Sequence, residues 1–416
     1  MKSSDNAVAD RPAIRVSLLV TLALLASVAP IATDLYLSAF PGMATDLQSS
    51  ATGIQFTLTA FLLGAALGQL LFGPLSDRLG RMRPLVVGAV IYVIASVAAA
   101  LAPTLAVLIA CRFVQGVSGA AGMVIGRAIV SDLAKGREAA RAFSLLMLVG
   151  GVAPVIAPLA GSLLLAPLGW RGLLWIIAGV AVVGLVATLL VVRETHPAEA
   201  RVKDAASAGQ GRALMSRRFL GNAVAYAFGF AVMMAYISAS PFLYQVLMGM
   251  SEVQYGVMFA ANAVVLCIVS AVAARITRTT SAVPVARIGL GVNLAAVAVI
   301  GVLVLMGTPT VAVCLAIMVA VGSLGMVFGT TTALALDSLP GGIGMGSAVL
   351  GVAQFGLAGA VSPLVSIGGE TTAVPLAVVM IAASLIANIA LWAAGGMRQE
   401  EIAAPEAEPV AVGASR

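Results

Sequence analysis

A succession of long apolar stretches, joined by short polar connections, constrains this chain more than any other feature. Of its 416 residues 61% are hydrophobic and 10% are charged, and the mean hydropathy is +1.08. A water-soluble domain of this size would lack a polar surface. In a lipid bilayer, only helices and closed barrels satisfy every backbone polar group. The runs do not alternate as barrel strands do, so the sequence predicts an all-α membrane protein.

The apolar runs predict about twelve transmembrane helices, since one crossing needs about 20 apolar residues. Their expected ranges are 15–40, 52–74, 84–102, 105–131, 140–165, 171–192, 220–246, 253–274, 284–305, 310–335, 342–366 and 372–394. The longest polar stretch between runs, 194–218, predicts a connecting loop between two six-helix bundles, 1–193 and 219–396. The acidic, Ala- and Pro-rich residues 397–416 are expected to form a disordered tail.

The two halves share sequence at corresponding places. The fourth run of the first half contains GAAGMVIG from Gly119, and the fourth run of the second half contains GSLGMVFG from Gly322. An internal duplication explains this similarity, and chance resemblance between Gly- and Ala-rich helices is the alternative. Two parallel repeats around a central cavity are a known plan of membrane transporters. The sequence therefore predicts two pseudo-symmetric bundles with a substrate site between them.

Lysine and arginine residues gather in the connections on one side of the predicted helices. They are Lys2, Arg11, Arg15, Arg78, Arg81, Arg83, Lys135, Arg137, Arg141, Arg193, Arg201, Lys203, Arg212, Arg217, Arg218, Arg275 and Arg278. Basic residues mark the cytoplasmic side of a membrane protein, so both termini are expected in the cytoplasm. The net charge of +6 is interpreted as this topology signal. The lipid bilayer is the expected partner, and nucleic acid is not.

The connection GPLSDRLGRMRP, residues 73–84, concentrates charge in an otherwise apolar chain. Gly73 and Pro74 are expected to end one helix, and Gly80 permits a tight reversal of the chain. Asp77 is expected to meet cationic groups or a helix N-terminus across the cytoplasmic seam. A basic loop that only sets topology is the alternative, but it would require neither Asp77 nor Gly80.

The run 105–131 carries a charged residue within the membrane. Arg112 and Gln115 share one helix face with three glycines, which allow close contact with another helix. An arginine at this depth is costly and points to function. Its expected counter-charge is Asp34, which lies at a similar depth in the first run. Such a pair can take and release a proton; the alternative is that Asp34 merely ends its helix. Arg127 is expected to extend to the membrane surface.

The first, fifth and seventh runs contain further candidate functional residues. In the fifth run, Gly150, Pro154 and Pro158 recur every four residues and predict a bent helix whose small face, together with Gly161, packs against the opposite half. A purely structural kink is the alternative. A possible substrate pocket combines aromatic and small polar groups; its expected residues are Tyr36, Tyr236, Ser240 and Phe242.

Other reactive residue types are scarce. Cys111, Cys267 and Cys314 lie in separate runs and are expected to be buried structural thiols, with no disulfide or metal site. The single histidine, His196, is expected to be a solvated loop residue. An enzyme would need a cluster of histidines, cysteines or paired acids, whereas this chain offers only Asp34 and Arg112 within the membrane. The sequence therefore predicts that the protein is not an enzyme.

Five stretches together resemble the major facilitator superfamily and one of its exporter groups. Gly73, Asp77, Arg78, Gly80 and Arg81 match its signature between the second and third helices. RFVQGVSGAAG, from Arg112, resembles its fourth-helix motif, and GGVAPVIAPLAG, from Gly150, resembles the fifth-helix motif of its drug–proton antiporters. TDLYLSAFPGMATDL, from Thr33, and VRETHP, from Val192 at the end of the sixth run, are similar to multidrug exporters of the Bcr/CflA type.

The resemblance implies a proton-coupled exporter of small amphipathic drugs or antibiotics. It would act by alternating access in the bacterial cytoplasmic membrane, without a cofactor and as a monomer. It also implies that Asp77, Arg81 and Asp132 form a charge cluster that closes the cytoplasmic side and breaks as the halves rock. The sequence departs from the pattern at Ala26, where some of these exporters carry an acid, and this puts the proton stoichiometry in doubt.

Two other classes of function compete with drug export: an importer or exporter of a small metabolite, and a membrane enzyme or receptor-like sensor, which would need the cluster of reactive residues that this chain lacks. A dedicated exporter of a small metabolite would have the same fold, and the fifth-helix prolines do not exclude it, although they argue against an importer. ATP hydrolysis is not the expected energy source, because the chain has no phosphate-binding loop motif.

Overall fold

The computed structural model describes residues 15–134, 136–196, 214–307, 310–339, 343–367, 369 and 372–394. Every regular element in this part of the chain is helical, which confirms the predicted all-α class. The predicted tail at 397–416 lies outside the described residues. The predicted loop at 194–218 is described only at its two ends.

The first half begins with a helix that is shorter than predicted. Its α-helices are α1 (Val16–Asp34), α2 (Phe40–Asp46), α3 (Ala51–Leu79), α4 (Met82–Ala100), α5 (Leu105–Leu133) and α6 (Gly136–Val191). The run expected to continue to residue 40 stops at Asp34 and passes through a 3-10 turn, η1 (Leu37–Ala39), into α2. Polar caps set two of the helix starts, because the Ser50 and Thr104 hydroxyls accept bonds from backbone N–H groups.

The second half repeats this plan with more interruptions. It contains α9 (Arg217–Pro241), η2 (Phe242–Leu247), α10 (Glu252–Ile276), α11 (Ala282–Leu305), α12 (Thr310–Ser323), α13 (Gly325–Asp337), α14 (Ile343–Val361), η3 (Ser362–Ser366) and α15 (Val374–Ala394). Helices α12 and α13 meet at Leu324 and together form one apolar segment of 28 residues. Helix α9 starts two residues before the predicted boundary at 219.

The described residues contain 11 continuous segments long and apolar enough to cross a membrane, and one of them holds two crossings. The segment Val152–Val191 has 40 residues, and a straight helix of that length would measure about 60 Å, twice the roughly 30 Å hydrocarbon core. Gly169 interrupts it with φ 65° and ψ 173°, a conformation open to glycine. The described chain therefore makes the twelve crossings that the sequence predicts.

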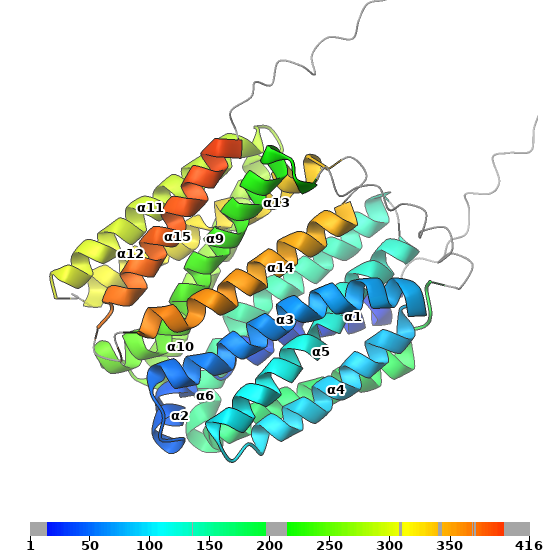
Figure 1. Cartoon of the computed structure of the whole chain (residues 1–416), viewed down its shortest axis with the longest axis horizontal. Helices are drawn as coiled ribbons and strands as arrows, with labels where there is room; N and C mark the ends of the chain where they lie inside the picture. Colours follow the sequence, from blue (N-terminus) through cyan, green and yellow to red (C-terminus); the bar gives the residue numbers. More distant parts are fainter. Residues whose placement is uncertain are drawn as a thin grey trace, which may run out of the picture.

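The helices gather into two groups that meet along a seam. In Figure 1, α3 and α14 run side by side between α1, α4 and α5 on one side and α9, α11, α12 and α15 on the other. The second contact across the seam joins α6 to α10. These two pairs of long helices form most of the seam, and the short elements η1, α2, η2 and η3 add contacts at one end of it.

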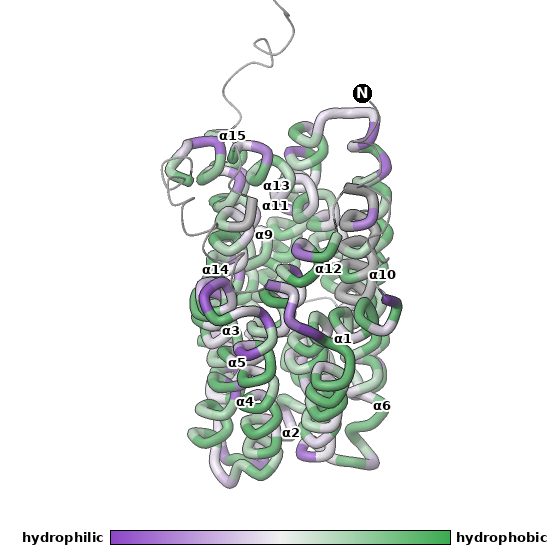
Figure 2. Tube along the Cα trace, turned by 90° about the vertical axis from the view of Figure 1, so that its right-hand side faces the viewer, coloured by the Kyte–Doolittle hydropathy of each residue, from purple (hydrophilic) through white to green (hydrophobic). Residues whose placement is uncertain are grey.

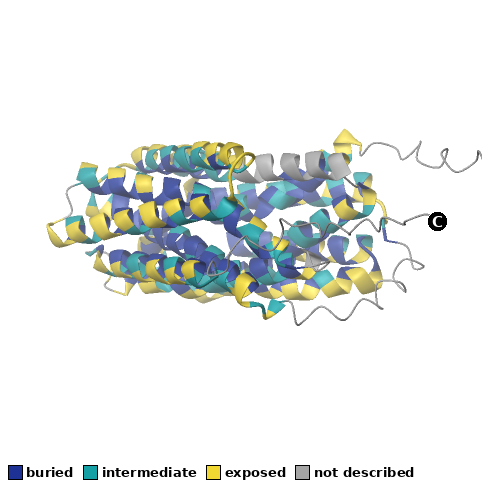
Figure 3. Ribbon diagram, turned by 90° about the horizontal axis from the view of Figure 1, so that it is seen from above, coloured by how far each residue is buried: buried dark blue, intermediate teal, exposed yellow. Residues whose placement is uncertain are grey.

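The outer surface suits a bilayer. Hydrophobic residues follow most of each helix in Figure 2, and Figure 3 shows exposed residues on the outer faces with buried residues between the helices. Large apolar side chains such as Leu190 and Leu305 are 79% and 80% exposed. So much exposed apolar surface is expected where lipid is the solvent.

Glycines let α3 and α5 approach closely. A Cβ atom placed on Gly64 or Gly68 would collide with the backbone of α5, and one on Gly116 would collide with the Phe61 carbonyl of α3. Small residues at such a crossing bring two backbones into van der Waals contact. This packing holds Arg112, which lies one turn before Gly116, at a fixed depth.

Candidate functional site

The first candidate site surrounds Arg112, whose side chain is fully buried. Its Nη1 donates to Gln115 Oε1 at 3.0 Å, and its Nη2 donates to the Ala32 carbonyl at 2.7 Å. The guanidinium lies 4.6 Å from the ring centres of both Tyr36 and Phe61. Two aromatic faces and neutral oxygen acceptors therefore stabilise the buried cation.

Gln115 extends this network to a neighbouring helix. Its Nε2 donates to Ser96 Oγ at 2.7 Å, and Ser96 Oγ in turn donates to the Tyr92 carbonyl at 2.7 Å. The glutamine thus joins α5 to α4, while Arg112 joins α5 to α1. The network fixes the orientation of the guanidinium.

Asp34 ends α1 beside this network and is 4% exposed. Its Oδ1 accepts a hydrogen bond of 2.8 Å from the Thr33 hydroxyl, and the turn η1 that follows it contacts α9 and α10 of the opposite half. The other described carboxylates are exposed or partly exposed, so Asp34 is the one buried acid of the described chain. It lies where the two groups of helices meet.

The expected ion pair between Asp34 and Arg112 is not formed in this structure. The described ion pairs involve Arg81 and Arg171, and Arg112 takes the Ala32 carbonyl instead. The physical reason is the break after Asp34, which turns the end of α1 and offers a backbone oxygen to the guanidinium. The structure places the two residues in one region without direct contact.

The second candidate site is a charge cluster at one end of the first group, which we call the Arg81 end. Arg81 Nε and Nη2 donate to the two carboxylate oxygens of Asp132 at 2.9 and 3.3 Å, and Nη1 donates to Asp77 Oδ1 at 2.5 Å. Burial alone would lower the pKa of Arg81, but the bonds to Asp132 and Asp77 outweigh it and raise that pKa above its ordinary value. The structure thus brings together the three residues of the expected cluster.

Residues missed by the sequence reasoning complete this cluster. Glu194 accepts from the backbone N–H groups of Arg81 at 2.8 Å and Met82 at 3.1 Å, so a carboxylate caps the start of α4. Thr195 Oγ1 donates to Asp132 at 2.9 Å. His196, expected to be solvated, is only 5% exposed. The bonds described here join α3, α4, α5 and the end of α6 within one group of helices.

Removing the Arg81 side chain is expected to destabilise the protein. Arg81→Ala leaves Asp132 partly buried without its cation, a change that costs about 3 kcal/mol. Arg78, in the same loop but exposed, provides the control, because Arg78→Ala is expected to change the stability by no more than about 0.5 kcal/mol. Thermal unfolding of the purified variants in detergent measures both effects. Equal unfolding temperatures for the two variants would contradict a stabilising cluster.

The end of α3 differs from expectation. Gly73 and Pro74 do not end the helix, which continues to Leu79 with Pro74 inside it. A proline removes a single backbone bond, and the helix continues around it. Gly80, with φ 89°, produces the actual reversal, as the tight turn required.

The fifth-helix motif lies in α6 and contacts both groups. Gly150 falls outside the residues whose surroundings are described. Pro154 is partly buried and Pro158 is buried, and both lie inside the helix. Gly161 packs on the Leu35 carbonyl of its own half, where a Cβ atom would collide. The contact with the opposite half is made next to it, between Ser162 and Gly256 of α10.

The four residues of the possible substrate pocket do not line one open cavity in this structure. Tyr36, Tyr236 and Ser240 are at most 2% exposed. The Tyr36 hydroxyl lies 3.0 Å from Thr57 Oγ1, and the Tyr236 hydroxyl accepts from Asn262 at 2.7 Å. Phe242 packs against Phe40 across the seam, with ring centres 6.3 Å apart. Their role in substrate binding stays a prediction.

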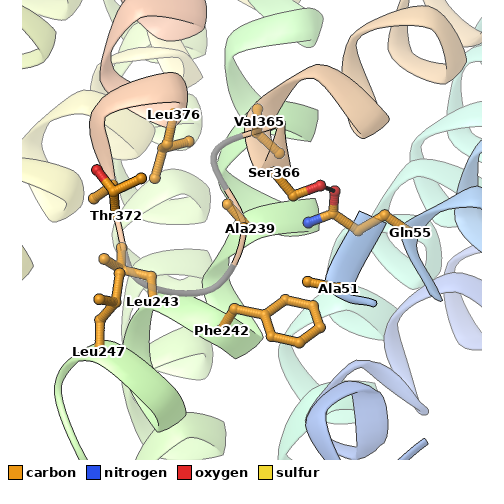
Figure 4. Close-up of a pocket in the computed structure, with 12 residues that line it drawn as sticks. Ala51, Gln55, Ala239, Phe242, Leu243, Leu247, Val365, Ser366, Thr372 and Leu376 are labelled. Atoms are coloured by element: carbon orange, nitrogen blue, oxygen red, sulfur yellow. Dashed lines mark hydrogen bonds between the residues drawn. The ribbon is translucent and has the colours of Figure 1, made fainter. Parts of the chain in front are cut away.

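Hydrogen bonds close the seam at the end opposite to Arg81, which we call the sealed end. Gln55 Nε2 donates to the Ser238 carbonyl at 2.9 Å, and Ser366 Oγ donates to Gln55 Oε1 at 2.6 Å. Gln245 also bonds the Ser38 carbonyl at 3.0 Å. Figure 4 shows Gln55 and Ser366 meeting end to end beside Phe242. The space left among these side chains is about 20 Å³, room for about one water molecule.

A larger cavity lies at the seam on the Arg81 side. Its volume is about 140 Å³, and its polar lining residues are Gln69, Arg127, Tyr226, Thr332, Ser347 and Gln354. Arg127 therefore faces the seam and does not extend to the membrane surface as expected. The sequence signal that could have found this site is the presence of Gln69 and Gln354 inside apolar runs.

Comparisons with known proteins agree on the family. The profile of the Major Facilitator Superfamily matches residues 22–363. The chain is 34% identical over 396 residues to an uncharacterized MFS-type transporter, YdgK, of Bacillus subtilis, covering 93% of this chain and 97% of the relative. It is 32% identical over 241 residues to the multidrug resistance protein MdtL of Escherichia coli, covering 58% of this chain and 61% of the relative.

Solved transporters share the fold. A D-xylose–proton symporter superposes with a TM-score of 0.71 at 14% identity, covering 89% of this chain and 96% of the symporter. The nucleoside transporter NupG superposes with a TM-score of 0.70 at 13% identity, covering 91% and 100%. The twelve crossings, the two groups of helices and the profile match lead to one conclusion: this chain is a transporter of the Major Facilitator Superfamily and not an enzyme.

Proposed function

We propose that this protein is a proton-coupled secondary active exporter of small amphipathic drugs or antibiotics, of the Bcr/CflA type. The observation that carries the proposal is the position of Asp34, the one buried carboxylate of the described residues, at the seam and beside the Arg112 network. A membrane-buried acid that faces a protein interior marks a proton pathway. The proton gradient drives transport, with no cofactor.

Protonation of Asp34 can be coupled to the movement of the two halves. A neutral carboxyl group tolerates a dry, closed seam, whereas an ionised one is stabilised when the seam opens to water. Any ligand that binds two conformations differently shifts their balance, and a proton is such a ligand. Binding of a proton and release of a substrate can thus drive opposite steps of one cycle.

The sidedness of the cycle follows from the charges. Arg78, Arg83, Arg217 and Arg218 are exposed or partly exposed at the Arg81 end, and basic residues mark the cytoplasmic side. The termini are accordingly cytoplasmic, and the sealed end faces outward. In the bacterial cytoplasmic membrane, a monomer in this conformation receives its substrate from the inside. Outward opening then requires the bonds of Gln55 to break.

The substrate class is supported by the relative MdtL, which is named a multidrug resistance protein. The gate role of Asp77, Arg81 and Asp132 is part of the same proposal. In the described conformation the cluster ties four helices together within one group, so that they can rock as a unit. Asp77, whose side chain is 61% exposed, is available to meet the opposite group when the inner side closes.

A drug-susceptibility panel tests the proposal. The wild type and Asp34→Asn are expressed to equal levels in a pump-deficient bacterial host and exposed to chloramphenicol-like, quinolone, tetracycline and cationic dye compounds. We expect resistance to several compounds in the wild type and loss of it in the variant. Absence of any protection by the wild type would contradict drug export and would favour a dedicated metabolite exporter.

A further inference from the structure

The 140 Å³ cavity at the seam has the features of a binding site. Gln69 comes from α3 and Arg127 from α5, whereas Tyr226 comes from α9 and Gln354 from α14. At 1.5 Å per residue, these side chains lie about 9 to 16 Å from the helix ends at the Arg81 side. Both halves thus contribute polar groups to one space within the membrane.

Gln69 is the first sign that this space holds a ligand. Its side chain is 2% exposed, and neither Oε1 nor Nε2 has a hydrogen-bond partner. Buried amide groups are nearly always bonded, because an unmade bond is strongly unfavourable. The amide lies on the bare Cα of Gly351, where any Cβ atom would collide with it. The chain therefore keeps room for an unpaired amide that lines the cavity.

Arg127 supplies charge to the same space. Its Nε donates to the Met123 carbonyl at 3.1 Å, and the ion pairs of the described chain are made by Arg81 and Arg171. No Asp or Glu side chain belongs to the described lining of the cavity. An arginine stays protonated at any physiological pH. The cavity thus carries a positive charge that no described lining residue neutralises.

The other residues that line the cavity add hydrogen-bond donors and aromatic rings. The Tyr226 hydroxyl donates to Gln354 Oε1 at 2.7 Å, which leaves the amide Nε2 of Gln354 as its donor group. Phe355 also lines the cavity, and the Tyr226 and Phe328 rings lie 6.0 Å apart. A dry cavity of about 150 Å³ holds one benzene molecule. The space therefore has room for about one aromatic ring, and its polar lining residues offer donors to an acceptor group attached to that ring.

We infer that this cavity is a subsite for the aromatic carboxylate portion of a substrate. The carboxylate binds the guanidinium of Arg127 and the Nε2 of Gln69, and the ring lies against Tyr226 and Phe355. Arginine recognises a planar carboxylate through paired N–H groups. The same charge disfavours permanent cations, so the exporter selects anionic aromatic compounds over cationic dyes. This selectivity in transport rests on the proposed function, whereas binding of an aromatic carboxylate in the cavity does not depend on it.

Binding of three probes of equal size tests the inference. Equilibrium dialysis of the purified full-length protein in detergent uses radiolabelled benzoate, with benzamide and the cation benzamidine as competitors. In the wild type, we expect benzoate to bind about tenfold more tightly than benzamide and benzamidine to compete least. Comparable affinity for the three probes, or no binding of benzoate, would overturn the inference.

Substitutions of Arg127 and Gln69 test whether these residues bind the carboxylate. Arg127→Gln is expected to weaken benzoate about tenfold and to leave benzamide unchanged, and Gln69→Leu is expected to weaken benzoate severalfold. Arg83→Gln, at an exposed position outside the cavity, is the matched control. If Arg127→Gln does not fold, Arg127→Lys keeps the charge and should retain part of the binding. Unchanged benzoate binding in both Arg127→Gln and Gln69→Leu would reject the site.

The transport readout separates this inference from the proposed function. Binding of benzoate that depends on Arg127, without export of any compound of the susceptibility panel, would retain the subsite and reject drug export. Export of anionic and cationic compounds alike, unchanged in Arg127→Gln, would retain the exporter and reject the subsite.

Discussion

Asp34→Asn is expected to abolish proton-coupled export while leaving the protein folded. Asparagine has the size of aspartate, and its Oδ1 can still accept the bond from the Thr33 hydroxyl, so packing is preserved. It cannot exchange a proton, however, and the coupling between protonation and the movement of the halves is lost. In everted membrane vesicles, proton release on substrate addition should fall about tenfold or more, as measured by a pH-sensitive dye.

The control for this experiment is Asp337→Asn. Asp337 ends α13 and is exposed, so removal of its charge is expected to leave proton release unchanged. Proton release that persists in Asp34→Asn would show that another group carries the proton. Thermal unfolding of both variants in detergent shows whether a loss of signal reflects chemistry or misfolding.

A disulfide across the sealed end is expected to stop transport completely and reversibly. Thr52 and Ser366 belong to opposite groups of helices, and their hydroxyl oxygens lie 3.0 Å apart. Cysteines at these positions are close enough to pair, and alternating access requires them to separate. Thr52→Cys with Ser366→Cys, in a background with Cys111, Cys267 and Cys314 replaced by serine, should transport when reduced and stop when oxidised.

A second cysteine pair provides the matched control. Ser238 and Ser362 have hydroxyl oxygens 2.7 Å apart but lie in the same group of helices. Their disulfide should form equally well and leave transport unchanged, because that group is expected to move as a unit. Transport by the oxidised Thr52–Ser366 pair, with the cross-link verified by mass, would show that the seam does not open at this end.

The fold could be read from the sequence because the bilayer imposes strict rules on it. A run of about 20 apolar residues must form a helix in lipid, so the crossings could be counted without knowledge of their neighbours. The turn at Gly80 was predictable for a local reason, since its φ of 89° is open to glycine. The end of the preceding helix was not predictable. Pro74 disfavours a helix locally, yet the helix continues to Leu79.

The candidate sites depended on contacts between distant segments. Cys314 and Cys267 were both expected to be buried, but only Cys314 is buried, whereas Cys267 is exposed. An apolar run does not reveal which side of its helix faces lipid. Glu194 belongs to the VRETHP motif, but its role as cap of α4 requires the end of α6 to reach residue 81. Sequence distance carries no information about such a contact.

The sequence by itself determined the solvent, the helical class, the number of crossings and the residues that carry charge into the membrane. The tertiary structure decided which groups these charged residues contact. Arg112 bonds the Ala32 carbonyl because α1 breaks at Asp34, and Arg127 faces a cavity because α3, α9 and α14 meet beside it. Hydropathy is a property of each residue, whereas a hydrogen bond or a cavity exists only when separate helices have packed.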